Sequence, residues 1–172
     1  MVIPKIGFAC KYIDLPEQVN GIKPTDDCKK YNTGTTTVAW LNRQSKAAAE
    51  EKLWSLMKTN IYAVKKLVEK VGSLNANCRM VRISSDILPC YTHADWSYFW
   101  QRADVVQYAE RAFSQVGDIA RRDNVRLSMH PGQFCCIASD NDGIIARSIE
   151  ELEYHANIAK WLGFAKSKLD FK

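Results

Sequence analysis

Two of the three histidines in this chain follow segments that have the character of β-strands. His130 directly follows residues 124–129, and His93 lies in the loop after residues 78–84. In α/β folds the carboxyl ends of parallel strands gather at one edge, where active sites form. Neutral imidazole binds divalent metals well, so both histidines are candidate metal ligands. The alternative is a pair of surface histidines that only form hydrogen bonds.

The third histidine, His155, lies inside a segment with helical periodicity. It comes three residues after Leu152 and four before Ala159. This spacing puts it at the inward edge of the helix. By itself, the spacing predicts a core histidine with its hydrogen bonds satisfied.

A tight turn at Pro131 and Gly132 should project the two residues that follow it, Gln133 and Phe134. An amide beside an aromatic ring suits nucleic acid, because the ring stacks on a base and the amide bonds to its edge. The competing interpretation is that Phe134 begins a buried apolar run that reaches residue 137. The residues alone favour the buried run.

The elements that must position these residues alternate between strand and helix. Strands are predicted at 5–10, 78–84 and 124–129, and helices at 47–71, 104–122 and 143–162. A polar segment rich in turn formers, 14–43, is predicted to be a long loop. The alternation indicates an α/β fold with parallel strands, as a doubly wound sheet or a β/α barrel. No glycine-rich nucleotide-binding motif follows a strand, which weakens the first option.

Apolar residues at steps of three and four predict the inward face of each helix. Gly72 is expected to follow the first helix as its C-terminal cap. The predicted inward residues are Leu53, Met57, Ile61, Val64, Val68 and Val71 in the first helix, Val105, Ala109, Ala112, Val116 and Ile119 in the second, and Ile145, Ile149, Leu152, Ala159 and Leu162 in the third.

The composition is that of a soluble globular protein. The 172 residues suit one domain, and 47% are hydrophobic and 25% charged. No apolar run approaches the roughly 18 residues of a membrane span, and the N-terminus lacks the pattern of a signal peptide, so we expect no membrane partner and a cytoplasmic location. The net charge of +5 is compatible with a polyanionic partner without requiring one. Six cysteines at irregular spacing favour structural thiols over a zinc site.

Four segments together resemble the signatures of the UV damage endonuclease family, in the family's order. They are residues 6–10 (IGFAC), 82–86 (RISSD), 127–134 (LSMHPGQF) and 147–156 (RSIEELEYHA). The resemblance implies a (β/α)8 TIM barrel, of which residues 1–172 would form the N-terminal part with three to four β/α units. It also implies a cluster of divalent metals, usually manganese, and incision of DNA on the 5′ side of ultraviolet photoproducts.

The resemblance also implies roles for single residues. His93, His130 and His155 match histidines that serve the family's metal cluster, which reverses the interpretation of His155 from spacing alone. Four further positions match residues that contact the DNA lesion. These are Gln133 and Phe134, a pair inserted into the duplex, together with Phe8 and Tyr12, the latter standing where the family commonly has Asn.

The family's catalytic carboxylates are expected in a C-terminal half that lies beyond Lys172. Three neutral imidazoles cannot hold several divalent ions without carboxylate charge, so the isolated chain is predicted not to cleave DNA. The expected partners are double-stranded DNA with photoproducts and either the missing half or a second copy of the chain. Two alternatives are a non-catalytic DNA-binding remnant and another metal-dependent TIM-barrel enzyme, of the abasic-site endonuclease or sugar isomerase type.

Overall fold

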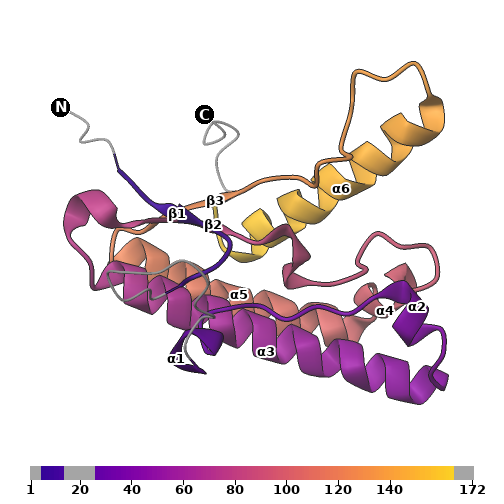
Figure 1. Cartoon of the computed structure of the whole chain (residues 1–172), viewed down its shortest axis with the longest axis horizontal. Coiled ribbons are helices and arrows are strands. Elements are labelled where there is room, and N and C mark those ends of the chain that lie inside the picture. Colours follow the sequence, from indigo (N-terminus) through magenta and orange to yellow (C-terminus); the bar gives the residue numbers. More distant parts are fainter. Residues whose placement is uncertain (1–4, 14–25, 165–172) are drawn as a thin grey trace, which may run out of the picture.

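The computed structural model describes residues 5–13 and 26–164, and its centre is a three-stranded parallel sheet (Figure 1). The strand order is β1–β2–β3, with bounds Phe8–Ala9, Met80–Ile83 and Arg126–Met129. Val81 in the central strand lies opposite Phe8 on one side and Leu127 on the other. The predicted α/β class with parallel strands is therefore confirmed, although each strand is shorter than predicted. Closure into a barrel stays a prediction.

Three long helices connect and cover the strands. They are α3 (Lys46–Gly72), α5 (Ala103–Arg122) and α6 (Asp142–Trp161), each within two residues of its predicted bounds. Side-chain caps fix the starts of two of them, because Ser45 accepts from the Ala48 amide and Asn141 accepts from the Ile144 amide. In Figure 1, α3 and α5 lie side by side beneath the sheet, and α6 runs outward beside β3.

Short helical turns occupy the connections. Two of them, α1 (Asp26–Lys29) and α2 (Val38–Leu41), fall within the segment predicted as one loop over 14–43. Residues 14–25 of that segment lie outside the described residues. The remaining turns are η1 (Ala76–Cys78), η2 (Ser85–Ile87) and α4 (Ser97–Trp100). Among the described residues, no helix has the length and apolar character needed to cross a membrane.

The core lies between the sheet and the helices α3 and α5. All six residues predicted to face inward from α3 are buried, as are Val105, Ala109, Val116 and Ile119 of α5. Phe113 fills the centre of this layer and stacks on Trp161 of α6, with ring centroids 5.9 Å apart. The prediction for Gly72 was wrong, because it is the last residue of α3 and the cap is Ser73. A side chain at Gly72 would meet Asp123, so close approach explains the glycine.

The inward face predicted for α6 was partly wrong. Ile149 is 47% exposed, whereas Ser148, Tyr154, His155 and Ile158 are buried. Of the predicted inward residues, Leu152, Ala159 and Leu162 line an open groove beside β3, and Leu162 is also buried. Periodicity located the apolar stripe of α6 but could not tell which neighbour covers it.

Candidate functional site

The carboxyl ends of the three parallel strands bring three connecting segments to one edge of the sheet. Cys10 follows β1, Ser84 follows β2 and His130 follows β3. Two non-glycine residues in these segments adopt left-handed backbone conformations, Cys10 with φ 64° and Cys90 with φ 59°. Such conformations are costly for residues with a Cβ and concentrate at functional sites. This edge is therefore the candidate functional site.

Two of the predicted metal ligands, His130 and His155, have one ring nitrogen already committed. Nδ1 of His130 lies 2.6 Å from the carbonyl oxygen of Pro131, and Nδ1 of His155 lies 2.7 Å from that of Glu151. A carbonyl oxygen can only accept, so Nδ1 carries the proton and Nε2 carries the lone pair. Nε2 of His155 is buried without a hydrogen-bond partner. Such an arrangement is typical of histidines that bind metal through Nε2.

His93 differs from the other two histidines. Its Nδ1 accepts a hydrogen bond from the Asp95 amide at 3.2 Å, so in the neutral ring Nε2 carries the proton. Within residues 5–13 and 26–164 there is no group of three or more His, Cys, Asp or Glu side chains placed to hold a metal ion. The donor set in this part of the chain therefore does not fit a shared metal site by itself, and the three-histidine cluster stays a prediction.

The predicted DNA-contacting pair lies in the segment after His130. Phe134 is 85% exposed, and Gln133 beside it is also exposed. The buried run that the residues alone favoured is wrong, because Ile137 is 59% exposed and Cys136 is exposed as well. An apolar ring held in solvent is available to stack on a base.

Phe8 and Tyr12 have a different environment from Phe134. Both are half-buried and pack against the core. Their rings meet edge to face at 5.7 Å, and the Tyr12 ring meets Tyr31 at 5.0 Å. The backbone of Tyr12 is also fixed, because its amide and carbonyl both bond to the side chain of Asn32. Lesion contact by these two residues stays a prediction.

One face of α6 holds the segments that follow β2 and β3. The Tyr154 hydroxyl donates to the Ser85 carbonyl at 2.7 Å and accepts from the Leu88 amide at 3.2 Å. Tyr154 is 3% exposed, and this burial raises the pKa of its phenol above the ordinary value. Glu151 and Ser148, about one and two turns earlier, bond to the segment after His130. These residues position the candidate site.

Sequence reasoning missed this role for α6. Neither Ser148 nor Glu151 is assigned a role from the sequence alone. A signal was present, since Ser148, Glu151 and His155 recur at helical spacing within an otherwise apolar stripe. Buried polar residues at that spacing indicate hydrogen-bond partners from another element.

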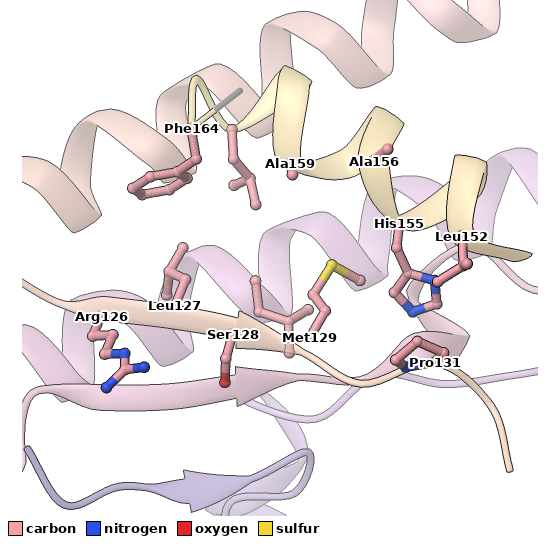
Figure 2. A pocket seen from close by; sticks show the side chains of 12 residues that line it. Arg126, Leu127, Ser128, Met129, Pro131, Leu152, His155, Ala156, Ala159 and Phe164 are labelled. Carbon is pink, nitrogen blue, oxygen red and sulfur yellow. The ribbon is translucent and has the colours of Figure 1, made fainter. Parts of the chain in front are cut away.

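Two hollows adjoin α6. The larger, about 700 Å³, is an apolar groove between β3 and α6. Figure 2 shows Leu127 and Met129 pointing from β3 toward α6, and His155 pointing from α6 toward Pro131. The smaller hollow, about 380 Å³, has a mixed lining that includes the charged or ionisable side chains of His93, Asp86 and Glu151. His155 and His93 thus line different hollows.

Comparison with known proteins gives consistent matches. Residues 4–171 match the family model described as UV-endonuclease UvdE. The chain is 33% identical over 154 residues to the UV-damage endonuclease of Schizosaccharomyces pombe, covering 90% of this chain and 22% of that protein. It is 29% identical over 142 residues to the UV DNA damage endonuclease of Clostridium perfringens, covering 81% and 32%.

A solved structure shares the fold. The crystal structure of SacUVDE superposes with a TM-score of 0.69 at 20% identity, covering 93% of this chain and 46% of that chain. The chain therefore spans less than half the length of these matched proteins.

Proposed function

The chain belongs to the UV-endonuclease UvdE family, and we propose on that premise that it supplies the DNA-recognition part of a repair endonuclease acting on ultraviolet-damaged duplex DNA. The observation that carries the proposal is Phe134, which is 85% exposed in the segment that follows His130 at the strand-end edge. Exposed aromatic rings at such an edge stack on unpaired or displaced bases. Photoproducts stack poorly in the duplex, so a ring can enter there at less cost than in intact DNA.

The proposal includes three further features that the resemblance implies. They are a TIM barrel completed by further β/α units, a cluster of divalent metals with manganese preferred, and incision on the 5′ side of the lesion. His130 and His155 support the proposal of a metal site, because in each ring Nδ1 is hydrogen-bonded to a carbonyl oxygen and the lone pair of Nε2 can bind a metal ion. Bound divalent metal supplies an activated water for phosphodiester hydrolysis. Carboxylates from outside the described residues would have to complete the site.

The first test is binding of the chain to two duplexes that differ only by one defined photoproduct. Phe134→Ala should weaken binding of the damaged duplex by about 5- to 150-fold, since stacking on one base contributes about 1–3 kcal/mol. Binding of the undamaged duplex depends on phosphate contacts and should change little. Ile137→Ala is the matched control, because Ile137 is also an exposed apolar residue of the same segment.

Two outcomes would reject the proposed recognition role. One is equal affinity of the unaltered chain for both duplexes, and the other is an equal loss in Phe134→Ala and Ile137→Ala. A nicking assay with manganese then tests the chemistry on the same damaged duplex. Cutting on the 5′ side that disappears in His130→Ala would assign cleavage to this chain, whereas damage-selective binding without cutting would assign it recognition only.

A further inference from the structure

Ser148 is a buried serine in the middle of α6 whose hydroxyl contacts a different segment of the chain. It is 2% exposed. Its Oγ accepts from the Cys136 amide at 2.8 Å and lies 3.1 Å from the Cys136 carbonyl oxygen and 2.8 Å from that of Ile144. The single hydroxyl proton can serve either carbonyl, so Ser148 pairs with the backbone of Cys136 in every arrangement.

Two further contacts hold the same segment. The Gly132 amide donates to Glu151 Oε1 at 3.3 Å, one turn along α6 from Ser148. The Cys135 thiol points to the Ser148 carbonyl, with 3.7 Å between sulfur and oxygen. Residues 132–136, here called the recognition loop, are thus tied to α6 at both ends, and Gln133 and Phe134 lie between the ties.

We infer that Ser148 is a positioning residue for DNA recognition, which holds the recognition loop on α6 so that Phe134 and Gln133 project in a fixed orientation. This inference rests on the proposed function. The Phe134 ring is 85% exposed and has little packing of its own to orient it, so the backbone on either side must do so. A loop ordered in advance loses less conformational entropy when the ring enters the duplex.

The test distinguishes the effect of the Ser148 hydroxyl group from the effect of side-chain volume. Ser148→Thr and Ser148→Val have nearly the same shape, and only the first keeps a hydroxyl. Ser114→Ala, an exposed serine of α5, is the control for mutation of a helical serine. In each variant, amide hydrogen exchange is measured for the Cys136 amide and for Val81 and Ile83 of β2, which report on the core.

In Ser148→Val the Cys136 amide should exchange at least about five-fold faster than in Ser148→Thr, the factor that one lost hydrogen bond produces. Exchange in β2 should be alike in the two variants. The ratio of affinities for damaged and undamaged duplexes should fall by a similar factor in Ser148→Val only. The affinity for the undamaged duplex should stay the same, because phosphate contacts do not depend on the ring.

Equal exchange rates of the Cys136 amide in the two variants would show that the Ser148 hydroxyl does not hold this amide, whatever the DNA results. Faster exchange with an unchanged affinity ratio would overturn the positioning role. If the unaltered chain does not discriminate between the duplexes, the proposed function fails and the positioning role fails with it. That failure is recognisable because the exchange results stand without DNA.

Discussion

Removal of one buried hydroxyl, in Tyr154→Phe, should destabilise the chain by about 2–3 kcal/mol. The Tyr154 ring stays in place against Tyr91, 4.6 Å away, so the change acts through hydrogen bonds alone. The hydroxyl serves the Leu88 amide and the Ser85 carbonyl, which would both lose their partner. A buried group left unpaired costs about 1–3 kcal/mol. The hydrogen bond from the Leu88 amide is buried, so its loss should account for most of the destabilisation. The hydrogen bond to the Ser85 carbonyl is only partly buried, so water can replace it in part.

The assay is urea unfolding followed by circular dichroism, with the free energy of unfolding compared at an unchanged slope. Tyr62→Phe is the control, since the Tyr62 side chain is 57% exposed, and it should change stability by less than about 0.5 kcal/mol. If the two variants are equally stable, the two hydrogen bonds do not hold the segment after β2 on α6.

Three further perturbations test other parts of the structure. In Gly117→Ala the new Cβ would lie 1.9 Å from the Leu162 carbonyl oxygen, so α5 and α6 must separate and the melting temperature should fall, by an amount equivalent to about 3 kcal/mol in calorimetry. Asn60→Ala removes the three hydrogen bonds that the buried Asn60 side chain of α3 forms with the backbones of Gly34 and Ile87, and should cost about 3 kcal/mol in urea unfolding. The hydrogen bond from Arg102 lowers the pKa of Asp104, so this carboxylate adds stability above its unfolded pKa that is lost as the pH falls through the lower folded value. Stability of Asp104→Asn should therefore decline less steeply than that of the unaltered chain below about pH 4, as acid titration of the melting temperature would measure.

Much of the fold could be predicted because the apolar periodicity of α3 and α5 is strong and their neighbours lie within the chain. The ends of the strands could not be predicted as accurately as those of the helices. β1 contains only Phe8 and Ala9, because backbone pairing depends on the neighbouring strand and not on the apolar run alone. For α6 the periodicity correctly predicted a helix, but Leu152 and Ala159 line the groove beside β3 and Ile149 is exposed, so local pattern could not decide burial.

For the candidate site, the positions of residues along the chain could be predicted, but their exposure and orientation could not. The positions of His130 at the end of β3 and of His93 in the segment after β2 followed from the alternation of elements. The exposure of Phe134 did not, because the apolar residues after it look like a buried strand until the ties from α6 are known. The orientation of the His155 ring depends on a hydrogen bond to the Glu151 carbonyl, a feature of the three-dimensional structure that spacing alone does not give.

The hydrogen bonds of α6 also impose an order of events on synthesis by the ribosome. The segments after β2 and β3 precede α6 in the chain, yet their backbone groups form hydrogen bonds with the α6 side chains of Ser148, Glu151 and Tyr154. While the nascent chain ends before residue 142, the recognition loop and the segment after β2 lack these partners and their amides are hydrated. The strand-end edge therefore takes its final form only after α6 has left the exit tunnel and docked.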